Sequence, residues 1–352
     1  MIQTDKSKAH ISIDAIRKDA FNIFKAGVVA ADPYQAVKRC LSAEEHHLEI
    51  LLDPNDKNKK RVGRWSAIHL IAFGKAACSM AQAAQEIIPV SLIAEQGIAV
   101  TNYENETTVD HFTVIGAGHP LPDDSGCRGA KMVAEIAQNA QKDELVLVLI
   151  SGGGSSLIPC PAEPVSLEEK IATTRLLLGC GATINQVNCV RKHLSGLKGG
   201  GLARKSAPAD LHALILSDVI GDDISSIASG PTVPDTTSFQ EARDVLTEKG
   251  IWNEIPENIR TFMDKGCDGQ IPDTPKPGDK VFANNGYTLI GSNALSVDSI
   301  VKSAQKLRYE TRIYTNELCG EARDEAEKLV LYAKQLIDQG FELIALGQKN
   351  ND

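Results

Sequence analysis

The sequence predicts an α/β fold: a doubly wound, mostly parallel sheet with helices on both faces, followed by a second, incomplete α/β domain. Apolar strand-like runs alternate with helical runs from residue 67 to residue 219, an order typical of parallel sheets. The run ELVLVLIS at 144–151 is apolar almost throughout, as a strand covered on both faces requires. The chain has 352 residues, more than the ~250–300 at which single domains usually stop growing.

Each expected element follows from its residue pattern. Apolar residues at helical spacing predict a first helix, which Ser12 would cap. An Ala-rich run predicts a helix over 75–87, and another is expected over 124–140, whereas the polar stretch 53–64 indicates a loop. The expected strands are 67–74, 96–103, 111–118, 144–151 and 212–219.

A segment rich in proline and glycine marks the expected domain boundary. DGQIPDTPKPGDK at 268–280 contains three prolines and two glycines, a composition typical of linkers. We therefore expect one domain over 1–275 and a partial second α/β domain over 276–352. The second would contain strands at 287–290, 309–316 and 341–347, and helices at 293–307 and 318–339.

Charge and cysteine usage exclude several classes of protein. Lys and Arg number 37 against 46 Asp and Glu, a formal net charge of −9, which argues against nucleic-acid and anionic-membrane partners. The eight cysteines form no C-x-x-C pair, and no apolar run approaches the ~18 residues of a membrane span. Reduced thiols fit a cytoplasmic protein best.

A glycine-rich loop follows the most buried expected strand. Three glycines can fold into a nest of N–H groups that binds anions, because no Cβ blocks close approach. Leu157 stands where both the nucleophile elbow G-x-S-x-G and the dinucleotide fingerprint G-x-G-x-x-G need glycine. We therefore predict phosphate binding, in preference to a plain turn, by Ser151, Gly152, Gly153, Gly154 and Ser155.

Four further candidate side chains lie at or shortly after expected strand ends. Lys75 in FGKA starts a helix, where the helix dipole disfavours a cation unless it faces an anion. Asp218 ends a strand and Asp222 follows in a loop; one or two such carboxylates suit Mg²⁺, although Asp222 is also an ordinary loop acid. His119 precedes a proline, and we interpret it as a structural hydrogen-bonding residue in preference to a base.

The segment INQVNCVRKHLSGLKGGG at 184–201 predicts an anion pocket. At helical period, Asn188 and Lys192 share a polar face, with Arg191 beside them and Lys198 following. Solvated helix faces usually mix Glu with Lys, yet no acid occurs from 184 to 201, and the cations run into three glycines. That pattern favours anion binding over an ordinary wet face.

Taken together, AFGKA, GHPLPDDSG, SGGGSS, ATINQVNCVRKHLSGLKGGGLA, LILSDVIGDD and IASGPT resemble the type-2, or MOFRL-type, glycerate kinases. The resemblance implies a Rossmann-like kinase domain over 1–275 and transfer of the ATP γ-phosphoryl group to the 2-hydroxyl of D-glycerate, with Mg²⁺. Lys75 and residues 151–156 would contact phosphate or substrate oxygens. Arg191, Lys192 and Lys198 would hold the glycerate carboxylate or a nucleotide phosphate, and Asp218 would anchor Mg²⁺ or draw the hydroxyl proton.

The sequence also departs from that family. The family continues into GGET and GGRNQE stretches that supply an arginine to the cleft, whereas this sequence ends at LIALGQKNND with neither. We therefore expect a C-terminally truncated member that lacks the far wall of the cleft. A catalytically impaired form or pseudo-enzyme is the alternative. A nicotinamide-dependent hydroxypyruvate reductase is less favoured, because the dinucleotide fingerprint fails.

Overall fold

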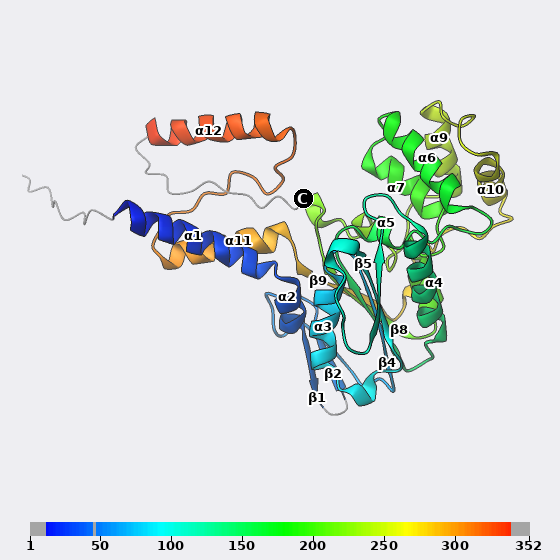
Figure 1. Ribbon diagram of the computed structural model, residues 1–352, viewed down its shortest axis with the longest axis horizontal. Helices are drawn as coiled ribbons and strands as arrows, with labels where there is room; N and C mark the ends of the chain where they lie inside the picture. The colour runs from blue at the N-terminus through cyan, green and yellow to red at the C-terminus, as the bar shows by residue number, and fades with distance from the viewer. Residues whose placement is uncertain (1–11, 45–46, 339–352) are drawn as a thin grey trace, which may run out of the picture. The chain divides into compact units, whose positions relative to one another are not determined.

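The computed structural model describes residues 12–44 and 47–338, which form two compact units (Figure 1). The larger unit comprises residues 33–290. Of the described residues, 12–32 and 291–338 form the smaller unit.

The larger unit is built on a six-stranded sheet in the order β6-β5-β4-β7-β8-β9. The strands from β4 to β8 pair in parallel, so the predicted fold class is confirmed. The order reverses between β4 and β7, because β5 and β6 extend the sheet on one side and β7 and β8 on the other. The strand bounds are β4 Ile68–Phe73, β5 Gly97–Asn102, β6 Phe112–Ala117, β7 Leu145–Ile150, β8 Asp210–Leu216 and β9 Asn285–Gly291.

Helices cover both faces of this sheet, because β4 and β7 are buried along their whole length. Leu70 and Leu147 pack in one apolar cluster with α3 (Ala77–Ile87) and α2 (Pro33–Cys40), while Ile71 and Val148 pack in another with α4 (Asp124–Asn139). Neighbouring residues of a strand point to opposite faces. Two short helices, α5 (Gly154–Leu157) and α8 (Gly201–Ser206), complete the second layer.

Four helices form a separate apolar cluster within the larger unit. They are α6 (Leu167–Gly179), α7 (Ile184–His193), α9 (Phe239–Glu248) and α10 (Glu257–Cys267). Capping boxes begin three of them, at Ser166, Thr183 and Ser238, where the side chain accepts an N–H bond and a Glu or Gln three residues later returns one. Single 3₁₀ turns lie at Val90–Leu92, Tyr103–Asn105, Ile220–Asp222, Ile227–Ser229 and Lys280–Phe282.

A second, three-stranded antiparallel sheet was not expected. It consists of β1 (Leu41–Glu44), β2 (His47–Leu51) and β3 (Lys60–Gly63). The predicted loop over 53–64 is therefore wrong at its end, where β3 pairs with β2. Alternate residues of β3 are exposed, so this strand carries lysine and arginine and lacks the apolar pattern of a buried strand.

The expected start of the second domain needs correction. Residues 276–290 belong to the larger unit, and β9 lies beside β8 in its sheet. Thr288 is buried; its hydroxyl donates to the Leu51 carbonyl at 2.6 Å and accepts from His212 Nε2 at 3.0 Å. These bonds, to residues far away in the sequence, hold β9 in the larger unit.

The smaller unit pairs α1 (Ile13–Ala30) with α11 (Asn293–Lys306) and also contains α12 (Ala322–Asp338). The Ser12 cap is confirmed, since its hydroxyl accepts from the Ala15 amide at 3.2 Å. The expected strand at 309–316 is absent, and the one at 341–347 lies outside the described residues. None of the helices within 12–44 and 47–338 combines the length and apolarity needed to cross a membrane.

Candidate active site

The loops after β4 and β7 meet where the strand order reverses, which is where open α/β sheets bind ligands. The Lys75 amide donates to the Gly152 carbonyl at 2.8 Å, and the Ala76 amide donates to Ser151 Oγ at 3.0 Å. Gly74 has φ +120°, and a Cβ there would overlap Ser151. Glycine is thus required for the two predicted loops to approach this closely.

The glycine-rich loop presents a row of unpaired amides. Within the part of the chain that the structure describes, the N–H groups of Gly152, Gly153, Gly154 and Ser155 have no acceptor. Gly153 takes the left-handed conformation, with φ 83° and ψ −7°, immediately before α5. Successive free N–H groups in such a turn form an anion-binding concavity. Anion binding by this loop stays a prediction.

Lys75 and His119 both lie against this loop. A Cβ on Gly153 would stand 3.3 Å from Lys75 Cγ and 2.9 Å from His119 Cδ2. Neither the Lys75 ammonium nor the His119 ring has a hydrogen bond or ion pair among residues 12–44 and 47–338. The interpretation of His119 as a structural hydrogen-bonding residue is therefore wrong. Burial and then the nearby Lys75 charge lower the pKa of His119, while Asp218 and Glu104 raise it.

Asp218 approaches the same loop from the end of β8. A Cβ on Gly152 would overlap its carboxylate, so the two lie in contact. Neither Asp218 nor Asp222 has a side-chain hydrogen bond to a described residue, whereas Asp223 accepts from Ser225 and Ser226. No cluster of three metal-ligating side chains occurs in the described ranges. A carboxylate without partners still suits Mg²⁺ that is bound mainly through phosphate oxygens.

Asn188 is joined to the glycine-rich loop through Ser229. Ser155 Oγ lies 2.6 Å from Ser229 Oγ, and Ser229 donates to the buried Asn188 Oδ1 at 3.1 Å. Ala228 and Ser229 both have positive φ, 49° and 61°, a costly conformation that clusters at functional sites. The sequence analysis missed Ser229, although the small-residue turn IASGPT contains it.

The predicted cations of the 184–201 segment are placed differently from one another. Lys192 Nζ is buried 3.2 Å from Asp235 Oδ1. Lys198 Nζ donates to the Ile158 carbonyl at 3.2 Å, and burial lowers the pKa of Lys198 well below its usual value. Arg191 is half-buried and has no partner among the described residues, and burial lowers its pKa. Ligand binding by Lys192 and Lys198 would require their present contacts to be exchanged, so these roles stay predictions.

The three glycines after Lys198 do not form a second anion site. The amides of Gly199 and Gly200 donate to the carbonyls of Ser229 and Gly230 at 3.0 and 2.8 Å. A Cβ on Gly201 would lie 2.7 Å from the Gly196 carbonyl oxygen. These glycines allow close backbone packing, and the expectation that they extend the anion pocket is wrong.

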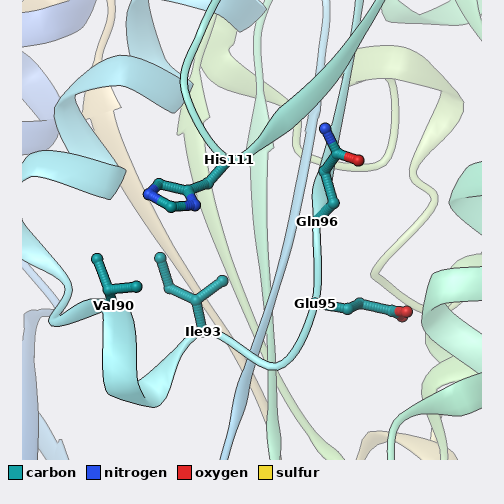
Figure 2. Close-up of a pocket in the computed structure, with 5 residues that line it drawn as sticks. All are labelled: Val90, Ile93, Glu95, Gln96 and His111. Carbon is teal, nitrogen blue, oxygen red and sulfur yellow. The ribbon is translucent and has the colours of Figure 1, made fainter.

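A hollow of about 370 Å³ lies at the opposite edge of the sheet (Figure 2). Gln96 and His111, which line it, directly precede β5 and β6. Figure 2 shows the Glu95 side chain pointing away from the His111 ring. This hollow is at the amino ends of the strands and contains none of the predicted site residues.

Known proteins resemble this chain over most of its length. Residues 19–264 match the model of a domain of unknown function, DUF4147. A glycerate 2-kinase of Pyrococcus horikoshii is 37% identical over 92% of this chain and 70% of its own length, and a glycerate kinase of Rattus norvegicus is 35% identical over 91% and 61%. This chain therefore spans about 60–70% of the length of such relatives.

A solved structure shows the same fold. The crystal structure of a glycerate kinase from Thermotoga maritima matches with a TM-score of 0.77 and 34% identity, covering 92% of this chain and 70% of that one. A relative from Agrobacterium vitis, 35% identical, is named a putative hydroxypyruvate reductase. From the matched domain and these relatives, the chain belongs to the DUF4147 family and is a member of the type-2 glycerate kinases.

Proposed function

We propose that the protein transfers the γ-phosphoryl group of ATP to the 2-hydroxyl of D-glycerate, giving 2-phosphoglycerate, in the cytoplasm. The observation that carries the proposal is the set of four amides at 152–155 that have no acceptor among the described residues, with the Lys75 side chain packed against Gly153. The names of the relatives from Pyrococcus horikoshii and Thermotoga maritima support the choice of substrate.

Charge neutralisation and positioning are the main requirements of phosphoryl transfer. The amide nest supplies fixed N–H donors, and Lys75 supplies a full positive charge at the same place. Such donors act strongly where charge develops, because they need no reorganisation. We therefore assign both to the anionic oxygens of the reacting phosphate or the substrate.

Arg191 is the strongest candidate for the glycerate carboxylate. Its guanidinium has no partner among the described residues, and Asn188, one helical turn before it on α7, is linked to the glycine-rich loop through Ser229. A guanidinium can hold a carboxylate with two parallel hydrogen bonds. Lys192 and Lys198 would support the position of Arg191 through their buried contacts.

Asp218 would hold Mg²⁺, with Asp222 as a second ligand. The fit rests on the Asp218 carboxylate, which lies against Gly152 without a hydrogen-bond partner in the described chain. When bound, Mg²⁺ would neutralise phosphate charge. We include ATP and Mg²⁺ in the proposal on this basis.

A coupled ADP-release assay with D-glycerate tests the proposal. Lys75→Met should lower turnover on the order of 10²–10³-fold, since it removes a charge that stabilises the reacting phosphate. Lys131→Met, at an exposed lysine of α4, should leave turnover unchanged. Equal turnover of wild type and Lys75→Met would contradict the assigned role.

The ADP-release assay and an assay of NADH oxidation together test the two alternatives. A wild-type chain that folds but releases no ADP would favour the catalytically impaired form. Oxidation of NADH with hydroxypyruvate would instead favour the reductase, the activity named for the Agrobacterium vitis relative.

A further inference from the structure

We propose that His119 is the general base of the reaction, accepting the proton of the substrate hydroxyl on a ring nitrogen as that hydroxyl attacks phosphorus. The inference rests on the proposed kinase function and adds a catalytic residue to it.

Three strand ends bring His119, Lys75 and Asp218 to the glycine-rich loop. His119 follows β6, whereas Lys75 follows β4 and Asp218 follows β8. A Cβ on Gly153 would lie 3.1 Å from His119 Nε2 and 3.3 Å from Lys75 Cγ. The imidazole edge therefore lies against Gly153, in the loop whose amides have no acceptor among the described residues. A base must come within hydrogen-bond reach of the proton it removes.

Among residues 12–44 and 47–338, the His119 ring has no hydrogen-bond partner, whereas each buried histidine has one. His69 bonds to Glu144 at 2.8 Å, His193 bonds to Asp273 at 3.0 Å, and His212 bonds to Thr288 at 3.0 Å. The half-buried His119 has no such partner in the described ranges. Both ring nitrogens are thus available to a ligand, as a base requires.

The charges around His119 favour its neutral form. Burial is the largest cause that lowers its pKa below 6.5, and Lys75 acts in the same direction. Asp218 and Glu104 oppose these effects, but the net shift is downward. A lowered pKa increases the fraction of His119 rings that are neutral and able to accept a proton.

The proposed step balances in atoms and charge. The hydroxyl O–H bond breaks, and its proton moves to a free imidazole nitrogen, which becomes the protonated ring. The hydroxyl oxygen forms a bond to the γ-phosphorus, while the bond from that phosphorus to the bridging oxygen breaks and ADP leaves with the electron pair. His119 then returns its proton to water. Asp218 stays available for the cation.

His119→Gln tests the base through the pH profile of turnover. We expect kcat at pH 7 to fall about 10²-fold, the lower end of the range for general bases, with a much smaller change in KM for D-glycerate. The acid limb of the wild-type kcat/KM profile, which reports groups of the free enzyme and has its midpoint below 6.5, should disappear in the variant. His111→Gln, at an exposed histidine outside the site, should behave as wild type. An unchanged acid limb in His119→Gln would overturn the proposal.

A second measurement needs neither turnover nor a variant that folds well. NMR of ¹³C-labelled histidine in the wild-type chain would follow His119 while D-glycerate or 3-hydroxypropionate, which lacks the 2-hydroxyl, is added. A hydroxyl that donates to the neutral ring should lower the pKa of His119 with D-glycerate only. D-Glycerate that binds without this shift would refute the base alone. Failure of D-glycerate to bind would refute the proposed function and, with it, this inference.

Discussion

Gly153 shows how one missing side chain shapes the candidate site. Its φ of +83° is strained for any other residue, and a Cβ would press on both His119 and Lys75. Gly181, with φ +69°, has the same conformation but open space around it. The two positions therefore separate the cost of backbone strain from the cost of displacing site residues.

Gly153→Ala should reduce turnover at least tenfold, because the new methyl group displaces His119 and distorts the amide nest. Gly181→Ala should lose about 1–2 kcal/mol of stability from the left-handed conformation alone and keep its turnover. Thermal unfolding and ADP release measured on both variants check this. Equal losses of activity in the two would contradict the role given to the loop.

Lys170 is a buried residue whose effect depends on pH. Its Nζ donates to the carbonyls of Pro159 and Leu194 at 2.6 and 3.0 Å, and burial lowers the pKa of Lys170 from 10.5 to about 7. Between these two values the unfolded chain binds more protons than the folded chain. The contribution of Lys170 to the free energy of unfolding therefore rises with pH above about 7 and is lowest below pH 7.

We expect the free energy of unfolding to rise by roughly 1 kcal/mol from pH 7 to pH 8 through Lys170. Lys170→Met should reduce that rise, and the exposed control Lys131→Met should not. Urea unfolding at the two pH values measures the difference. An identical pH dependence in wild type and Lys170→Met would show that the lysine is not buried as described.

Sequence reasoning correctly placed residues at strand ends, but it did not identify the hydrogen-bond acceptors of the buried lysines. Lys75, Asp218 and the glycine-rich loop follow buried strands, so strand periodicity alone placed them at one edge. Lys192 and Lys198 looked like ligands for anions, yet their acceptors, Asp235 and the Ile158 carbonyl, are about 40 residues away in the sequence. Only the folded chain brings such partners together.

At the scale of elements, the least predictable part was the small antiparallel sheet. On β3, Arg61 donates to Asp210 Oδ2 at 2.7 Å and to the carbonyls of Leu211 and Asn284 at 2.9 and 3.0 Å. It thereby ties β3 to the start of β8 and to the residue before β9. The residues next to Arg61 in the sequence do not indicate that its side chain joins two sheets.

Arg61→Met should lower the free energy of unfolding by about 2–3 kcal/mol, because a half-buried ion pair and two hydrogen bonds to a charged group are lost together. Lys60→Met, at an exposed lysine next to it on β3 that pairs with the half-buried Glu49, should cost about 1 kcal/mol or less. Denaturant melts compare them. A cost at Arg61 no larger than that at Lys60 would remove its assigned role in joining the sheets.

One predicted strand did not form, although its sequence favours β-structure, because it has no partner strand. Residues 309–316 alternate suitably, yet they form no strand, and the smaller unit contains no other described strand with which they could pair. An isolated strand leaves its backbone groups without partners. The helices predicted at 293–307 and 318–339 formed as α11 and α12, because helices satisfy their hydrogen bonds locally.

For the whole molecule, topology was the most predictable property. The alternation of strands and helices determined the parallel sheet, and the reversal of strand order between β4 and β7 brings together Lys75 and the loop at 151–155. Asp218 and His119 join them from the ends of β8 and β6. The boundary near residue 275 could not be located in the same way, because β9 enters the sheet through contacts with distant residues.

The central claim is that the free amides of residues 152–155 and Lys75 hold the anionic groups of the substrates. A crystal structure with a non-hydrolysable ATP analogue, Mg²⁺ and D-glycerate tests it most directly. The account predicts phosphate or carboxylate oxygens within hydrogen-bond distance of those amides and of Lys75 Nζ. Ligand bound elsewhere, with these amides facing only water, would contradict it.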